Sequence, residues 1–203
     1  MIVDCTVLGH SFVSGFAHHL QTMHSSTLSP SDVAFHLGVD NSCKRVHLIG
    51  FRGAHISRLY HGHFSDQIQP QLVIIDCGSN ELACGQPPLE VASNIVDCAK
   101  HLLSYSCVKK VLVCSLLVRT KKTGHFTNEQ FAKNVNMCNH YIKVFTSSES
   151  KIHYHTHQGF WAVPPGVWSL DGVHPNSAAG RKKYLSSLRR AILSVKSKVP
   201  SHS

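Results

Sequence analysis

Four short segments of the chain contain residue types that could together carry out acyl transfer. Gly9-His10-Ser11 supplies a hydroxyl, and GFRGAH (50–55) supplies two glycines. CGSNEL (77–82) supplies an asparagine, and DGVHP (171–175) supplies an aspartate and a histidine three residues apart. Acyl transfer requires a hydroxyl nucleophile, a base that takes its proton, and donors that stabilise the developing oxyanion. All three requirements can be met within these segments.

We expect Ser11 to be the nucleophile, His174 the base, and Asp171 the residue that orients the imidazole and stabilises its charged form. Each residue also has a simpler interpretation. Ser11 could cap a helix, since Ser is favoured at that position. His174 could cap the helix that follows it, and Asp171 could serve only the turn that Asp-Gly favours.

The oxyanion donors are expected to be the backbone N–H groups of Ser11 and Gly53 and the side-chain amide of Asn80. A glycine at position 53 lets the backbone approach a substrate oxygen without a side chain in the way. Gly50 competes with Gly53 for this role, and Asn80 could instead bond only within its own loop.

The elements that must position these residues alternate along the chain. β-like apolar runs occupy 2–9, 45–50, 71–78, 108–117 and 151–157. Helical patterns occupy 11–24, 87–106, 127–145 and 176–196, with a shorter one at 54–62, and 24–44 and 157–171 are expected to be loops. Alternation of this kind predicts an α/β three-layer sandwich, a parallel sheet of about five strands with helices on both faces. Reactive groups in such sheets gather beyond the carboxyl ends of the strands.

The composition is that of a globular chain, with 42% hydrophobic and 15% charged residues. At 203 residues it is expected to form one domain over 1–203. No apolar run is long enough for a membrane span, and the N-terminus reads as a strand and not as a signal peptide. Because this strand begins almost at once, the sequence is also compatible with a domain taken from a longer protein.

Eight cysteines and a formal net charge of +9 suggest the cellular setting. No C-x-x-C pair is present, so we expect free thiols in a reducing compartment, and hence an intracellular protein of the cytoplasm or nucleus. The positive charge permits association with RNA through a basic surface, but the basic C-terminal stretch is more typical of a solvated helix face than of a dedicated binding patch.

The segment HYHTH (153–157) raises the alternative of a metal site. Its three histidines would share one side of a strand, because side chains alternate with period two. No acidic residue or cysteine in the segment completes a site, and the chain has 17 histidines in all. We therefore expect no metal.

The four segments, in this order, resemble the SGNH (GDSL-type) hydrolase family, which is named for its Ser, Gly, Asn and His. They span residues 7–180, and the most specific part is D-x-x-H-P-x-x-x-x-G from Asp171 to Gly180. The resemblance implies a flavodoxin-like sheet, the catalytic residues Ser11, Asp171 and His174, and an oxyanion hole of Ser11, Gly53 and Asn80. It also implies neither a metal nor an organic cofactor.

The chain departs from the family pattern at two positions. His10 stands where the family usually has Asp before the nucleophile, and Glu81 replaces Asp after the family asparagine. His10 also places a second imidazole beside Ser11, where it could perturb the titration of the site. A narrower resemblance, carried by LGHSFV (8–13), is to esterase-like domains in the first-reading-frame proteins of non-LTR retrotransposons, which would imply an RNA partner.

Two functions remain open at this point. The first is a serine esterase that hydrolyses small or lipid-like acyl or acetyl esters through an acyl-enzyme, or an acyltransferase that uses the same residues. The second is an RNA-binding module on the same fold, since a fold alone does not define a function. Aromatic residues 160, 161 and 168 are candidates for an apolar pocket wall. The sequence does not indicate an oligomeric state.

Overall fold

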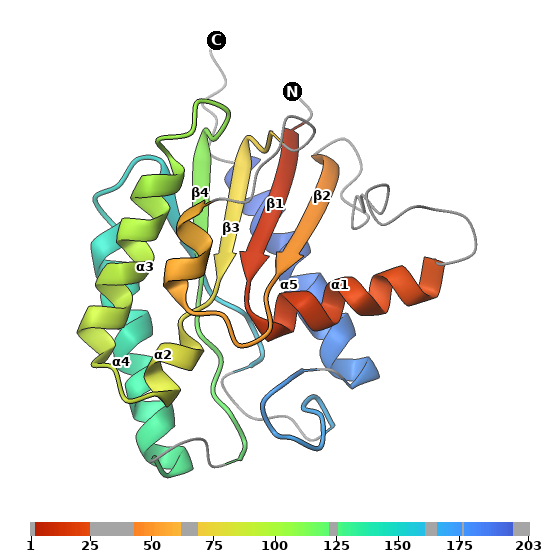
Figure 1. Ribbon diagram of the computed structural model, residues 1–203, viewed down its shortest axis with the longest axis vertical. Coiled ribbons are helices and arrows are strands. Elements are labelled where there is room, and N and C mark those ends of the chain that lie inside the picture. The colour runs from red at the N-terminus through yellow and green to blue at the C-terminus, as the bar shows by residue number, and fades with distance from the viewer. Residues whose placement is uncertain are drawn as a thin grey trace.

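The computed structural model describes residues 3–24, 43–61, 69–121, 126–160, 166–175 and 177–196. Within these ranges, strands and helices alternate along the chain (Figure 1). The strands are β1 (Val3–Gly9), β2 (Cys43–Gly50), β3 (Leu72–Asp76), β4 (Lys110–Cys114) and β5 (Ile152–His155). The α-helices are α1 (Ser11–His24), α2 (Ser79–Ala83), α3 (Pro88–Leu102), α4 (Asn128–Thr146) and α5 (Ala178–Lys196), and a 3-10 helix, η1, covers Ile56–His61.

The five strands form one sheet in the order β2-β1-β3-β4-β5, and every neighbouring pair is parallel. This is the flavodoxin-like strand order, in which the chain switches direction between β1 and β3. The prediction of an α/β sandwich with a flavodoxin-like parallel sheet is therefore confirmed. The switch point matters because ligands of such sheets bind at the carboxyl ends of the strands beside it.

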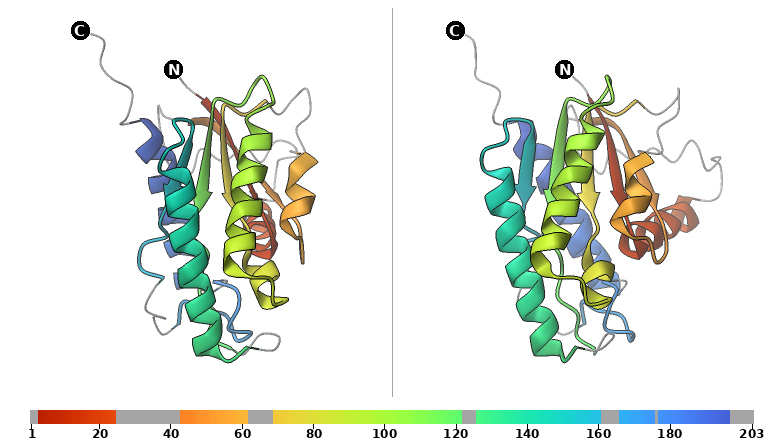
Figure 2. Two further views of the ribbon diagram at one scale, coloured as in Figure 1. Left: turned by 90° about the vertical axis from the view of Figure 1, so that its left-hand side faces the viewer. Right: turned by 60° about the vertical axis from the view of Figure 1, so that its left-hand side comes forward.

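Helices cover both faces of the sheet (Figure 2). Successive residues of a strand pack on opposite sides of the sheet. Val73 and Ile75 of β3 belong to the core shared with α3 and α4, whereas Leu72 and Ile74 belong to the core shared with α1 and α5. All five residues of β3 are buried. Burial on both faces explains why the central strands are continuous apolar runs and not alternating ones.

Several element boundaries differ from the predicted ones. The fourth apolar run was expected to be a strand over 108–117, but β4 ends at Cys114 and the chain continues as an extended segment. The predicted helix at 54–62 is the 3-10 helix η1, and the five-residue helix α2 was not predicted. Most of the loop predicted at 24–44 lies outside the described residues, and the described part of 157–171 contains no helix or strand.

The start of α1 packs directly against the ends of β1 and β2. A Cβ atom added to Gly50 would lie 2.1 Å from the backbone nitrogen of Ser14. One added to Gly9 would lie 2.4 Å from a methyl group of Val13 and 2.6 Å from the carbonyl oxygen of Asp76. Gly50 therefore serves close packing of β2 on α1.

A buried carboxylate ends β3 on the α5 side of the sheet. Asp76 is 2% exposed and accepts a hydrogen bond from the hydroxyl of Tyr184 on α5. The Nε2 atom of His157 lies 3.5 Å from the same carboxylate, and His157 Nδ1 lies 2.8 Å from Ser187 Oγ. Burial alone raises the pKa of Asp76, but His157 and Tyr184 together hold it below its usual value. This polar network fastens α5 to the sheet.

The described residues can also be compared with the expectations about membrane helices and cysteines. No helix in the described part of the chain is long and apolar enough to cross a membrane. The cysteines whose side chains the structure describes are all free, and most of them are buried.

We predict that Tyr184→Phe lowers the free energy of unfolding by about 1–3 kcal/mol, because it leaves a buried carboxylate without its hydroxyl donor. Urea denaturation at neutral pH measures this loss. Tyr141→Phe is the matched control, since no hydrogen bond of the Tyr141 hydroxyl is seen within the described ranges. Equal losses in the two variants would show that the Asp76 contact contributes nothing specific.

Candidate active site

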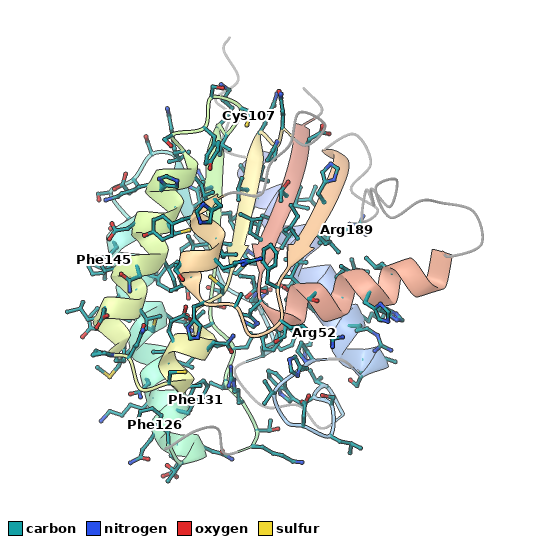
Figure 3. The ribbon with its side chains drawn as sticks, in the orientation of Figure 1. Arg52, Cys107, Phe126, Phe131, Phe145 and Arg189 are labelled. Carbon is teal, nitrogen blue, oxygen red and sulfur yellow. The ribbon has the colours of Figure 1, made fainter. Side chains whose placement is uncertain are left out.

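The carboxyl ends of β1, β2 and β3 bring the predicted residues to one edge of the sheet. Ser11 follows β1, Gly53 follows β2, and Asn80 follows β3. Arg52, beside Gly53, lies at this edge close to the start of α1 (Figure 3). The predicted Asp171 and His174 reach the same edge of the sheet from the loop that precedes α5.

Ser11 is the first residue of α1, and His10 occupies the preceding position. Its hydroxyl is 2.7 Å from Nε2 of His174 and 3.4 Å from Nδ1 of His10. The hydroxyl makes no capping bond to the helix backbone, so the interpretation of Ser11 as an ordinary N-cap does not describe its contacts. The backbone N–H of a first helical residue has no partner within the helix, and it lies at the positive end of the helix dipole.

His174 lies between Ser11 and Asp171. Its Nδ1 atom is 2.6 Å from Oδ2 of Asp171, while Nε2 faces the Ser11 hydroxyl. Because an ionised carboxylate only accepts hydrogen bonds, Nδ1 must carry the proton, which leaves Nε2 of a neutral imidazole as the acceptor for Ser11. His174 does not cap α5, since Ser177 performs that role by accepting from the backbone N–H of Gly180.

Asp171 shapes its own turn and also holds His174. Its Oδ1 atom accepts hydrogen bonds from the Ser169 hydroxyl and from the backbone N–H groups of Val173 and His174. Partial burial alone raises the pKa of Asp171, but these bonds and the His174 ring hold it well below its usual range. The carboxylate is therefore ionised at every pH at which the protein would be assayed.

Gly53 and Asn80 lie on two segments that a hydrogen bond joins. Gly53 has a φ of +66°, a conformation that favours glycine, and a Cβ added there would meet nothing within 4 Å. The Asn80 amide donates from Nδ2 to the carbonyl oxygen of Ala54, next to Gly53. Gly53 therefore borders open space, whereas Gly50, its competitor from the sequence, is packed against α1.

Glu81 holds the loop that contains Gly53 against α2. Its carboxylate accepts a hydrogen bond from the backbone N–H of Ile56 and lies 3.4 Å from Nδ1 of His55. The residue is 3% exposed. The departure from the family pattern at this position thus supplies a structural tether between α2 and the Gly53 loop.

Sequence reasoning did not identify Arg119, which lies in the extended segment after β4. Its guanidinium is buried and donates from Nη2 to Ser79 Oγ at 3.1 Å and to Asn80 Oδ1 at 3.0 Å. It also lies 5.2 Å from the ring centre of Phe131 on α4, which Figure 3 labels. The only sequence signal is a single charge that closely follows the apolar run of β4.

His10 is fully buried behind the Ser11 hydroxyl. Its Nε2 atom is 3.2 Å from Ser79 Oγ, and its ring packs edge-on against Phe12. Burial lowers the pKa of His10 to about 4; the negative charge of Asp76 opposes this shift, and the positive charge of Arg119 adds to it. His10 is therefore neutral at physiological pH. The expectation that His10 perturbs the titration of the site thus concerns a neutral imidazole and not a charged one.

The segment after β4 also supports the loop that carries His174. Thr120 donates hydrogen bonds from its backbone N–H and its hydroxyl to the carbonyl oxygen of Gly172. Gly172 has a φ of +64°, and a Cβ there would lie 2.6 Å from the Thr120 hydroxyl. Adjacent residues, Arg119 and Thr120, thus hold the two halves of the site.

A cluster of aromatic rings packs against one side of His174. Phe12 packs edge-on against both His174 and Trp168, and Trp168 packs in the same way against Phe160. Phe160 is buried and Trp168 is partly buried, so these rings support the His174 loop. Trp161, the third aromatic residue of the predicted pocket wall, lies outside the described residues.

Two of the three HYHTH histidines, His155 and His157, contact α5. His155 Nε2 and His157 Nδ1 both lie within hydrogen-bond distance of the Ser187 hydroxyl. Over the ranges that the structure describes, no group of three or more potential ligand side chains is arranged to hold a metal ion.

Comparison with known proteins shows which proteins share this fold. No family model and no curated protein matches the chain. A candidate acylhydrolase from Bacteroides fragilis superposes with a TM-score of 0.67 at 15% identity, over 95% of this chain and 87% of the other. The catalytic domain of Streptococcus pneumoniae peptidoglycan O-acetyltransferase A gives 0.63 at 14%, over 98% and 97%. A lipolytic protein of the G-D-S-L family from Veillonella parvula gives 0.62 at 17%, over 97% and 99%.

These likenesses extend over nearly the full length of the solved structures. The chain therefore has the fold of the SGNH (GDSL-type) hydrolases, as the resemblance in the sequence implied. At these low identities, the likeness shows the fold and not the chemistry. The evidence for the chemistry is the set of residues at the edge of the sheet.

We predict that His10 makes the protein sensitive to acid. Between pH 6.5 and about 4 the unfolded chain binds a proton at His10 that the native state does not bind, so stability falls as the pH falls through this window. The loss from His10 amounts to about 3 kcal/mol at its limit.

Urea denaturation between pH 7.5 and 4.5 tests this prediction in wild type and His10→Gln. The variant should lose less stability on acidification than wild type, because it removes the group that titrates. The same pH dependence in both proteins would contradict a buried, neutral His10.

Proposed function

We propose that the protein is a serine hydrolase of carboxylic esters that acts through an acyl-enzyme formed on Ser11. The observation that carries this proposal is the chain of contacts from Ser11 through His174 to Asp171, with distances of 2.7 and 2.6 Å. The shared fold supports it, because the solved neighbours are described as acylhydrolase, O-acetyltransferase and lipolytic proteins.

In the acylation step, Nε2 of His174 takes the proton of Ser11 as Oγ attacks the carbonyl carbon of the ester. The electron pair of the carbonyl bond moves to its oxygen. The N–H groups of Ser11 and Gly53 and the amide of Asn80 stabilise this oxyanion. Asp171, ionised and bonded to Nδ1, stabilises the imidazolium. The tetrahedral intermediate then collapses, and the alcohol leaves with the proton from His174.

In the deacylation step, His174 accepts a proton from water, and the hydroxide attacks the acyl carbon of the acyl-enzyme. The same donors stabilise the second oxyanion. Collapse returns the proton to Ser11 and releases the carboxylic acid. The reaction requires neither a metal nor a redox cofactor. If an alcohol takes the place of water in this step, the same residues perform acyl transfer.

The substrate class that we propose is a small acyl or acetyl ester, with lipid-like esters as the longer members. An added Cβ at Gly53 would meet nothing within 4 Å, so this position leaves open space for a small acyl group. Association with RNA and location within the cell remain predictions from the net charge and the free cysteines.

We predict that wild type hydrolyses p-nitrophenyl acetate and that Ser11→Ala lowers kcat by roughly four orders of magnitude or more, because it removes the nucleophile. A series of longer p-nitrophenyl esters measures the acyl chain that the site accepts. Labelling with a fluorophosphonate, followed by mass spectrometry of the peptide, identifies the modified residue.

The matched control is Ser93→Ala on α3, where the hydroxyl bonds only Asp97 in the next turn. This variant should retain wild-type activity and labelling. Active protein whose Ser11 stays unmodified by the phosphonate would contradict the proposal. If wild type and Ser11→Ala are equally inactive on all esters, salt-dependent binding of RNA by the domain becomes the function to test.

A further inference from the structure

We propose that Arg119 is a positioning residue for the oxyanion hole: its guanidinium orients the Asn80 amide and makes its N–H a stronger donor. This inference rests on the proposed function, and it concerns a residue outside the set of nucleophile, base and oxyanion donors.

The contacts of Asn80 define which way its amide points. A guanidinium only donates hydrogen bonds, so the atom 3.0 Å from Arg119 Nη2 must be the amide oxygen. A backbone carbonyl only accepts, so the atom 2.9 Å from the oxygen of Ala54 must be the amide nitrogen. The two contacts agree on one orientation. They use one of the two Nδ2 hydrogens and leave the other for the oxyanion.

Arg119 is held in an unusual way for a buried charge. It is 6% exposed, and its described partners are the Ser79 hydroxyl, the Asn80 oxygen and the ring of Phe131. No carboxylate in the described ranges lies within ion-pair distance of it. Burial lowers the pKa of Arg119, and the negative charge of Asp171 opposes this shift without forming an ion pair. Burying a charge without a direct counter-ion is costly, and this guanidinium is a source of positive potential at the site.

That potential acts selectively on the transition state. A charged donor on the amide oxygen polarises the group and strengthens its N–H as a donor. The ground-state ester carries no charge near Asn80, whereas the tetrahedral intermediate carries a full negative charge on the oxygen that the amide binds. Stabilisation of the charged species alone raises kcat and leaves substrate binding nearly unchanged.

Arg119 also connects the oxyanion side of the site to the nucleophile. Ser79, which accepts from Arg119, lies 3.2 Å from His10, and His10 lies 3.4 Å from the Ser11 hydroxyl. A single residue after β4 thus supports both Asn80 and the imidazole behind Ser11. The kinetic test must separate the effect through Asn80 from this second branch.

The activity test uses Arg119→Met, which keeps the apolar stem beside Phe131 but removes the charge and the donors, and Arg119→Lys, which keeps the charge. We expect Arg119→Met to lower kcat for p-nitrophenyl acetate about 10- to 100-fold with little change in KM. Arg119→Lys should lose less. Arg190→Met is the control, since Arg190 is exposed and bonds Gln158 on the surface.

A double-mutant cycle with Asn80→Ala tests whether Arg119 acts through the amide. If it does, Arg119→Met costs much less in the Asn80→Ala background than in wild type. Full additivity of the two losses, or a loss confined to KM, would overturn the proposal. A merely structural role predicts additivity, because it does not depend on Asn80.

A second readout does not require activity. In the free protein, the Asn80 side-chain amide should give two distinct NMR resonances, identified by their absence in Asn80→Ala. In Arg119→Met, or in Arg119→Lys if the first variant does not fold, these resonances should move upfield or broaden. Unchanged resonances would overturn the proposal. Wild type that is inactive on every ester would contradict the proposed esterase and leave this readout to decide the role of Arg119.

Discussion

The close approach of α1 to the ends of β1 and β2 is the constraint on which the site depends. Gly9 and Gly50 leave no side chain between these strands and the helix, so the first turn of α1 rests on the sheet at its switch point. This contact fixes where the Ser11 hydroxyl and N–H lie relative to the loops after β2 and β3. A methyl group at Gly50 would push the helix, and Ser11 with it, away from those loops.

Two kinds of support complete the site around that fixed helix. The Asp171–His174 turn is held mainly by its own residues, because the carboxylate of Asp171 binds three donors of its own loop as well as the imidazole, and Thr120 adds a tether at Gly172. The oxyanion side instead relies on distant residues, since Asn80 is held by Arg119 and the Gly53 loop by Glu81.

The sequence sufficed for features that depend on local pattern. Continuous apolar runs predicted the buried strands β3 and β4, and the order of the four segments identified the residues that meet at the sheet edge. The contacts of Arg119 escaped prediction because they join segments about 40 residues apart in sequence. The burial of His10 escaped because a histidine beside a serine looks the same whether it faces solvent or core. The end of β4 was misplaced because apolar residues continue beyond the last paired residue.

The separation of Ser11 and His174 along the chain has a consequence for biosynthesis. The two residues that meet at 2.7 Å are 163 positions apart, and the His174 loop is tethered to the segment after β4 and followed by α5. During synthesis, β1 and α1 of this domain are made long before the segment that carries His174. The Ser11 hydroxyl therefore lacks its His174 partner until the region after β5 has been made and docked, so the contact between them forms only when nearly the whole sandwich has assembled.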